Sequence, residues 1–112
     1  MLNAKIKELL NNIAPTFYQS TKSDHDKYIV FSIYDEQDTS FCDDENTEEI
    51  YYITLNYWYT KPSDLKLYKK IKQTLKSNDF ITDGISDAKD GDLKGKRMDF
   101  IYYKNVEDEG EI

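Results

Sequence analysis

The sequence predicts an α+β fold, a small antiparallel or mixed sheet of four to five strands with two helices packed on one face. Three observations predict it. Two stretches carry apolar residues at helical spacing, and several others alternate apolar and polar residues as half-buried strands do. The third is their order, in which strands follow one another and a closing pair is typical of a hairpin. We expect a single domain over residues 1–106 and an acidic, disordered tail over 107–112.

Size and charge limit the classes of function to consider. The chain has 112 residues, enough for one core without disulfides, and its formal net charge is -7. Phosphate backbones and anionic membranes repel such a chain, so direct nucleic-acid binding and membrane binding are both disfavoured. The charged, amphipathic start lacks the pattern of a signal peptide, and one cysteine builds no intrachain disulfide framework. We therefore expect a protein of the cytosol.

The first expected element is an amphipathic helix. Its apolar residues follow the spacing i, i+4, i+7, i+8, i+11, which places them on one face. Asn3 is a candidate cap at its start, and Pro15 ends it because proline disfavours the α conformation of the preceding residue. The apolar stripe consists of Leu2, Ile6, Leu9, Leu10 and Ile13.

Two strands and a long loop are expected next. Residues 16–20 fit a short strand. Residues 28–34 alternate, with Ile29 and its odd-numbered neighbours facing the core and the even-numbered residues opposite. Across 35–49, eight of fifteen positions are acidic and no apolar period survives. This segment is predicted to be a long acidic loop.

The centre of the sequence sets an aromatic strand directly against a lysine-rich helix. In the strand, 50–59, the odd-numbered residues are expected to face the core, with Tyr52 and Trp58 on the opposite face. Pro62 ends this strand, and Ser63 is a candidate cap for a helix extending to about Ser77. The helix has an apolar stripe of Leu67, Ile71 and Leu75, surrounded by Lys66, Lys69, Lys70, Lys72 and Lys76.

The closing elements are two strands. The first covers 80–85, and the second alternates from Met98 to Tyr103. A polar run separates them, and Gly91 and Gly95 lie where a hairpin or wide turn needs a permissive backbone.

A search for catalytic machinery finds no convincing set. Cys42 and His25 are the one nucleophile–base pair available, but the acidic neighbours of Cys42 oppose formation of a thiolate. His25 itself stands between two aspartates in a polar turn and is interpreted as a surface residue. We predict that the protein is not an enzyme.

No metal or cofactor is predicted either. One cysteine and one histidine cannot form a zinc cluster. The acidic runs 43–48 and 83–92 lack the ligand spacing of a calcium loop, and the former also lacks its central glycine. The glycines form no phosphate-binding motif. The alternative left open is a specific cation in the acidic loop.

The lysine-rich helix and the even face of the aromatic strand each have more than one interpretation. The lysines are a solvated face or a docking surface for an acidic partner. With Tyr57, Trp58 and Tyr68 they also suggest stacking on single-stranded nucleic acid, which the acidic background opposes. Tyr52 and Trp58 are either covered by another layer or exposed at a protein interface, where tyrosine and tryptophan are enriched.

The order of these patterns resembles the small tail-completion, or head–tail joining, proteins of long-tailed bacteriophages and prophages of Gram-positive bacteria. The similarity covers most of 1–104 and is carried by IVFSIYDEQ, the acidic loop, YYITLNYWYTK, DLKLYKKIKQTLKSNDF and KRMDFIYYK. After the second helix such proteins often carry a glycine and an aromatic residue, where this chain has Asn78, Asp79 and Phe80.

The resemblance implies a structural α+β subunit without enzyme activity, cofactor or metal. Such subunits form an oligomeric ring between the head connector and the tail tube, and they can be monomeric alone. It further implies assembly in the cytoplasm of the bacterial host and a final place at the head–tail junction of the virion.

We hypothesise that opposite charges guide this assembly, the acidic loop of one subunit meeting the lysine helix of the next, or of the connector. The competing interpretation is a free cytosolic inhibitor or immunity-type protein, which covers a basic protein target with its acidic surface. The candidate interface residues are Asp43, Asp44, Glu45, Glu48, Lys66, Lys69, Lys70, Tyr52 and Trp58.

Overall fold

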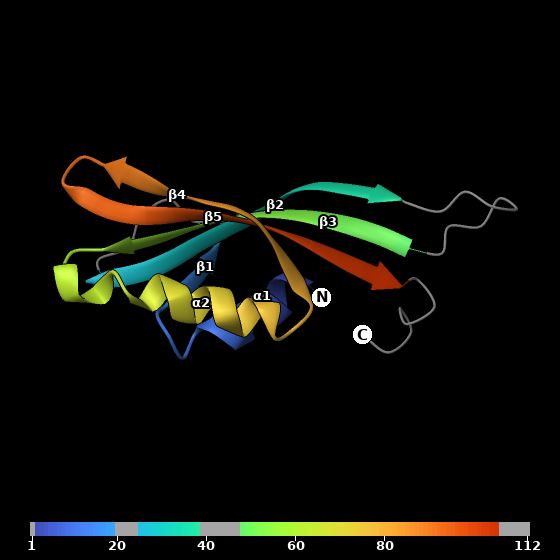
Figure 1. The fold of residues 1–112 in the computed structure, drawn as a ribbon, viewed down its shortest axis with the longest axis horizontal. Helices are drawn as coiled ribbons and strands as arrows, with labels where there is room; N and C mark the ends of the chain where they lie inside the picture. The colour runs from blue at the N-terminus through green and yellow to red at the C-terminus, as the bar shows by residue number, and fades with distance from the viewer. Residues whose placement is uncertain (1, 20–24, 39–47, 106–112) are drawn as a thin grey trace, which may run out of the picture.

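The computed structural model, described here for residues 2–19, 25–38 and 48–105, has one sheet and two helices (Figure 1). The predicted α+β class and the predicted order of elements are confirmed. The elements are α1 (Leu2–Leu10), β1 (Thr16–Tyr18), β2 (Lys27–Asp38), β3 (Glu48–Tyr59), a 3₁₀ turn (Pro62–Asp64), α2 (Leu67–Lys76), β4 (Phe80–Asp90) and β5 (Leu93–Asn105).

The sheet is mixed and has five strands in the order β1-β2-β3-β5-β4. The short edge strand β1 runs parallel to β2, and every other pair is antiparallel. The long central strand β3 pairs with β2 on one side and with β5 on the other. Because β3 is central and pairs along its whole length, it fixes the register of both neighbours.

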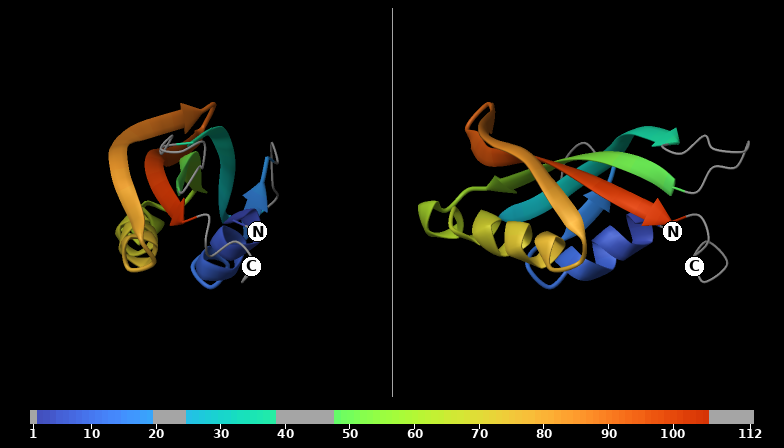
Figure 2. Two further views of the ribbon diagram at one scale, coloured as in Figure 1. Left: turned by 90° about the vertical axis from the view of Figure 1, so that its right-hand side faces the viewer. Right: turned by 45° about the vertical axis from the view of Figure 1, so that its right-hand side comes forward.

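The core lies between one face of the sheet and the two helices. Figures 1 and 2 show α1 and α2 on the same side of the sheet, under its curved surface. Spacing at i and i+4 places two residues of each helix in this core, and alternation supplies the sheet residues. The odd-numbered residues of β3 from Ile53 to Tyr59 are buried, as predicted. The fully buried side chains are Ile6, Leu10, Ile29, Phe31, Ile53, Leu55, Tyr57, Ile71, Leu75, Met98 and Phe100.

The predicted acidic loop is shorter in the structure at both ends. β2 extends to Asp38 and β3 begins at Glu48, so 35–38 and 48–49 are strand. These residues are polar and have low strand propensity, but ladder hydrogen bonds, between β2 and β3 and between β3 and β5, hold them in the extended conformation. The rest of the expected loop, 39–47, lies outside the described residues, as do Cys42 and the expected tail.

The polar run between the closing strands is also strand and not loop. β4 and β5 pair up to Asp90 and Leu93, which leaves Gly91 and Asp92 as a two-residue turn. Gly91 has a φ of 63°, the left-handed conformation that glycine adopts without steric cost. Gly95 is not in the turn but within β5.

The helix boundaries differ from the prediction at three points. α1 ends at Leu10, before the turn that leads to Pro15, and Asn3 lies inside its first turn. Pro62 opens the 3₁₀ turn, and α2 begins after Lys66 without a side-chain cap, so Ser63 is not its cap.

Asp79 follows α2 with a φ of 73°, in the left-handed region where glycine is usually found. This is the position at which the chain departs from the glycine-aromatic pattern. The aspartate therefore adopts the backbone conformation that a glycine would adopt there.

Candidate functional site

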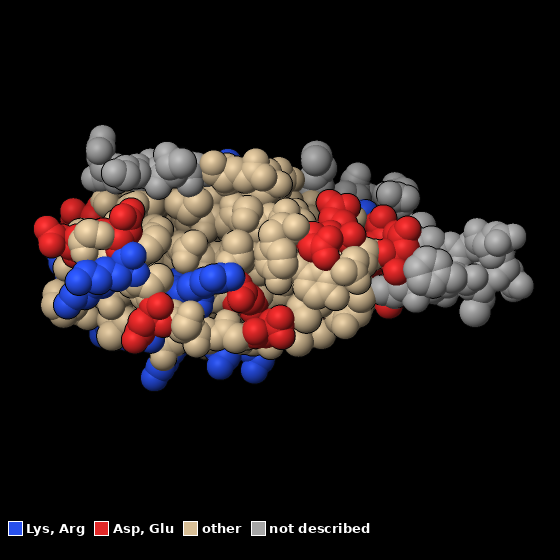
Figure 3. Space-filling view, turned by 90° about the horizontal axis from the view of Figure 1, so that it is seen from above, with Lys and Arg blue, Asp and Glu red and all other residues tan. Residues whose placement is uncertain are grey.

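The outer face of the sheet, opposite the helices, carries Tyr52 and Trp58. Both side chains are partly exposed, and in the described chain no helix lies over this face (Figures 1 and 2). Figure 3 shows the face from above, with a broad uncharged area and acidic side chains grouped to its right. Of the two interpretations of these aromatic residues, the structure agrees with exposure.

The cross-strand partner of Trp58 is Gly95, which has no side chain and so leaves room for the indole ring. A Cβ atom added to Gly95 would lie 2.5 Å from the carbonyl oxygen of Tyr57 and 2.6 Å from Cε3 of Trp58. The indole ring therefore occupies the space above the glycine. A preordered, partly exposed tryptophan loses little conformational entropy when a protein partner covers it.

The lysines of α2 form the second candidate surface, called here the lysine face: Lys66, Lys69, Lys70, Lys72 and Lys76. Lys72 is partly buried and the others are exposed. Within the described part of the chain, none of the five makes an ion pair. Because no described carboxylate neutralises these charges, the lysine face presents its full positive charge outward.

The third surface is the acidic end of the β2–β3 pair. It consists of Asp35, Glu36, Asp38, Glu48 and Glu49. Local hydrogen bonds order part of it. Asp35 accepts the amide of Glu36 and the side-chain amide of Gln37, each at 2.9 Å, and the hydroxyl of Tyr51 donates to Glu49 at 3.0 Å.

The acidic end and the lysine face are kept apart by β3 itself. Glu48 is the first residue of this 12-residue strand, and the turn into α2 follows its last residue, Tyr59. A strand of that length spans about 36 Å, at roughly 3.3 Å per residue. The two surfaces of opposite sign thus start from opposite ends of the sheet.

Partly buried polar contacts hold the turn before α2 against the sheet. The hydroxyl of Tyr57 donates to the carbonyl oxygen of Asp64 at 2.8 Å, and the Asp64 carboxylate lies 3.6 Å from the ammonium of Lys27. Burial, and next the nearby negative charge of Asp64, raises the pKa of Tyr57 above its ordinary value. The phenol therefore stays protonated and keeps its hydrogen bond.

A second contact ties α2 to the β4–β5 hairpin. Lys96 donates to Asp87 at 2.5 Å, and its ammonium lies 4.9 Å from the centroid of the Tyr68 ring. The hydrogen bond to Asp87 is the main reason that the pKa of Lys96 is raised. Lys96 is thus neutralised within the domain, unlike the lysine face.

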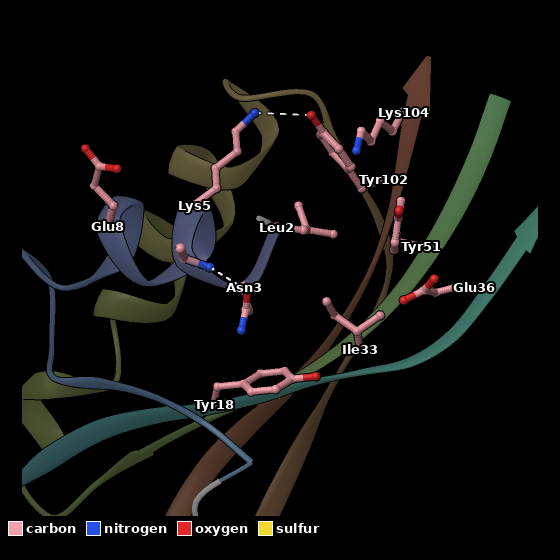
Figure 4. Close-up of a pocket in the computed structure, with 11 residues that line it drawn as sticks. Leu2, Asn3, Lys5, Glu8, Tyr18, Ile33, Glu36, Tyr51, Tyr102 and Lys104 are labelled. Atoms are coloured by element: carbon pink, nitrogen blue, oxygen red, sulfur yellow. Dashed lines mark hydrogen bonds between the residues drawn. The ribbon is translucent and has the colours of Figure 1, made fainter. Parts of the chain in front are cut away.

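A groove of about 690 Å³ opens between α1 and the inner face of the sheet (Figure 4). Aliphatic and aromatic side chains, among them Leu2, Ile33 and Tyr102, line it. Lys5 donates to the hydroxyl of Tyr102 at 3.2 Å across its upper side. Glu8 comes from α1 and points away from these residues, whereas Glu36 comes from β2. The groove brings no pair of carboxylates together for acid–base chemistry.

The other sequence candidates are distributed as follows. Asp43, Asp44 and Glu45 lie outside the described residues. Glu48 begins β3 at the acidic end, and Lys66, Lys69 and Lys70 belong to the lysine face. The structure therefore places the candidates on three separate surfaces.

The three aromatic residues considered for stacking on nucleic acid do not share a surface. Tyr57 is fully buried on the inner face, Trp58 lies on the outer face, and Tyr68 packs beneath Lys96. This geometry removes the stacking interpretation for that set. His25 is exposed and its ring stacks on Phe17 with centroids 6.1 Å apart.

Alternation placed Tyr34 and Tyr103 opposite the inner faces of their strands, but it did not show that they gather with Ile81 as an exposed apolar area. Tyr34, Ile81 and Tyr103 expose about half of their surface, at 55%, 50% and 43%. Their clustering depends on the register of four strands and on bulges in β2 and β4, which the sequence pattern does not give.

Two further features concern the described residues alone. Among them, no three or more histidine, cysteine, aspartate or glutamate side chains gather in a way that would hold a metal ion. Neither of the described helices has the length and apolar character of a membrane span.

No protein-family model matches the chain, and no curated protein matches it significantly.

Proposed function

We propose that the chain is a structural assembly protein of a phage or prophage particle, completing the tail and joining it to the head connector as a ring-forming subunit. The resemblance of the sequence to tail-completion proteins supports this proposal. So does the observed order of helix, strands, aromatic strand, lysine helix and closing hairpin, which is the order on which the resemblance depends.

The observation that carries the proposal is the separation of charge. The lysine face has no ion pair among the described residues, and the acidic end lies at the other end of β3. A head-to-tail ring needs two different complementary surfaces on each subunit, so that each copy offers one to each neighbour. Opposite charges at the two ends supply such a pair and steer its register.

Charge alone does not hold a ring together. Exposed ion pairs contribute about 0.2–1 kcal/mol each, so apolar burial must supply most of the free energy of association. The partly exposed aromatic residues of the outer face, including Tyr52 and Trp58, offer this area. Aromatic side chains of this kind are the usual anchors of protein interfaces.

The test is removal of the coding gene from an inducible phage genome that carries it, followed by electron microscopy of the lysate. We expect DNA-filled heads and separate tails that lack this completing subunit and are not joined to the heads. Wild-type protein supplied from a plasmid restores joining, whereas Lys66→Glu with Lys69→Glu and Lys70→Glu does not. Lys7→Glu with Lys89→Glu and Lys94→Glu changes three exposed lysines outside α2 by the same total charge; it is the matched control and restores joining. Intact particles without the gene would contradict the proposal.

The competing function is a free inhibitor or immunity-type protein, and the acidic end favours it as a surface for a basic target. The two differ in what the protein binds. An inhibitor forms a one-to-one complex with a basic toxin or enzyme and has no role in particle assembly. A lysate in which deletion leaves particles intact, and a captured basic target, would together favour this alternative.

A further inference from the structure

The outer face of the sheet is organised in rows, because cross-strand partners point to the same side. One apolar row crosses the sheet at Trp58, between Tyr28 and Gly95. Two polar rows follow along β3, at Asn56 and at Thr54, whose partners in β5 are Arg97 and Asp99. Beyond them the face becomes apolar again.

This second apolar region is called here the distal apolar patch. Tyr52 pairs with Ile101, and Ile101 pairs with Ile81 of β4. The ring of Tyr34 lies beside that of Tyr52, with centroids 6.1 Å apart. In the next row Ile50 pairs with Tyr103. The patch thus consists of Tyr34, Ile50, Tyr52, Ile81, Ile101 and Tyr103.

The distal apolar patch holds most of the exposed large hydrophobic residues in the described chain. There are four such residues, and three of them, Tyr34, Ile81 and Tyr103, belong to this patch. Contiguous exposed apolar area of this kind marks interaction surfaces in soluble proteins.

Carboxylates surround the patch. Asp35 is the cross-strand partner of Tyr52, Asp99 lies in the adjoining row, and Asp83 lies in the bulge of β4. Partial desolvation raises the pKa of Tyr34, and the charges of Asp99 and then Asp83 raise it further. Arg97 opposes this effect and lies 3.5 Å from Asp99. The rim is therefore mainly acidic.

The fourth exposed hydrophobic residue is Leu65, which is 36% exposed. It lies between the 3₁₀ turn and α2, directly before Lys66 and four residues before Lys69. The start of α2 is thus an apolar point next to lysines that make no ion pair with any described residue. Its chemistry is the complement of an apolar patch with an acidic rim.

We propose that the distal apolar patch of one copy binds the start of the lysine face, with Leu65, of a second copy. This inference rests on the proposed function and names the contact by which the ring would form. The patch does not suit a symmetric contact with itself, because Asp35, Asp83 and Asp99 would face their own copies. The two partner surfaces begin at opposite ends of β3, so the contact is head-to-tail and leaves a patch and a lysine face for further copies.

The test is sedimentation equilibrium of the purified chain at low salt. Two variants are compared with the wild type, one altered in the distal apolar patch and one in the lysine face. Ile81→Asp with Tyr103→Asp alters the patch at exposed positions. Lys66→Glu with Lys69→Glu alters the lysine face. We expect the wild type to form assemblies and each variant to sediment as a monomer. Circular dichroism of each variant establishes that it is folded.

Mixing the two variants distinguishes this contact from any other. The patch variant keeps a lysine face and the lysine variant keeps a patch, so the equimolar mixture has one working contact. We expect the average mass to double to that of a dimer and to go no further. Control variants with the same charge changes at exposed positions elsewhere assemble as the wild type does. They are Ser86→Asp with Asn12→Asp for the patch variant, and Lys7→Glu with Lys89→Glu for the lysine variant.

Three results would overturn the inference. They are a wild type that stays monomeric at the highest soluble concentration, a lysine variant that still self-associates, and a mixture that stays monomeric. None of these results changes what the gene deletion is expected to show, because a chain that binds only the connector or tail tube still joins heads to tails. Conversely, intact particles after deletion of the gene would contradict the proposed function, whatever mass the chain has in solution.

Discussion

At the scale of single residues, Tyr57 shows how one side chain joins the strand to the helix that follows it. Its ring fills the core, and its hydroxyl donates to the Asp64 carbonyl in the turn before α2. We expect Tyr57→Phe to lower the free energy of unfolding by about 1 kcal/mol, since the carbonyl loses a buried donor. Urea denaturation at neutral pH measures this change, and Tyr103→Phe at an exposed position is the control.

The same residue predicts a dependence on pH. Burial raises the pKa of Tyr57 in the folded chain, so above pH about 10 the unfolded chain ionises this phenol first. The contribution of this phenol to stability is therefore fully present below pH about 10 and falls as the pH rises toward the folded pKa. Between pH 9 and 11, roughly, the decline should be less steep for Tyr57→Phe than for the wild type. Equal slopes would show that this tyrosine does not contribute to the decline.

Gly95 permits the position of Trp58 on the outer face. A Cβ atom there would overlap the Tyr57 carbonyl and the indole ring. We expect Gly95→Ala to destabilise the fold by roughly 1–3 kcal/mol, the usual range for overpacking. Combining it with Trp58→Leu should recover part of the loss, because only the overlap with the carbonyl then remains. A double-mutant cycle by urea denaturation measures the coupling, and strictly additive effects would contradict the contact.

At the scale of elements, the helices were the most predictable part and the strand ends the least. The i, i+4 spacing of Ile71 and Leu75 specified the buried face of α2 without any knowledge of the sheet. By contrast, 35–38 and 83–92 are polar, and only pairing with neighbouring strands makes most of these residues extended. The distal apolar patch depends on that pairing and on two bulges, so the sequence alone could not assemble it.

Substitution of one leucine in α1 and one just before α2 tests where the core lies. Leu10 is fully buried under the sheet, whereas Leu65 is exposed before α2. We expect Leu10→Ala to cost about 2–5 kcal/mol of unfolding free energy, because it leaves a cavity among the core side chains. Leu65→Ala is the matched control and should change stability by less than about 0.5 kcal/mol. Chemical denaturation of both variants checks this, and similar losses would contradict the observed core.

At the scale of the whole molecule, the domain is elongated, with extents of 53 × 23 × 23 Å. The described chain pairs some charges internally, as in Lys27 with Asp64 and Lys96 with Asp87. It leaves the lysine face without such partners and gathers carboxylates at the other end of β3 and around the outer-face patch. Uneven pairing of this kind is the physical basis on which we propose assembly through complementary surfaces.

The most direct test is the mass of the wild-type chain by light scattering at low and high salt. At low ionic strength we predict an average mass above the 13.3 kDa of one chain. At about 1 M salt, where the screening length is about 3 Å, the average mass should be lower than at low salt, because the charge contribution to association is screened while the apolar contribution remains. A mass of 13.3 kDa at both salt concentrations, or a mass that rises with salt, would contradict assembly through opposite charges.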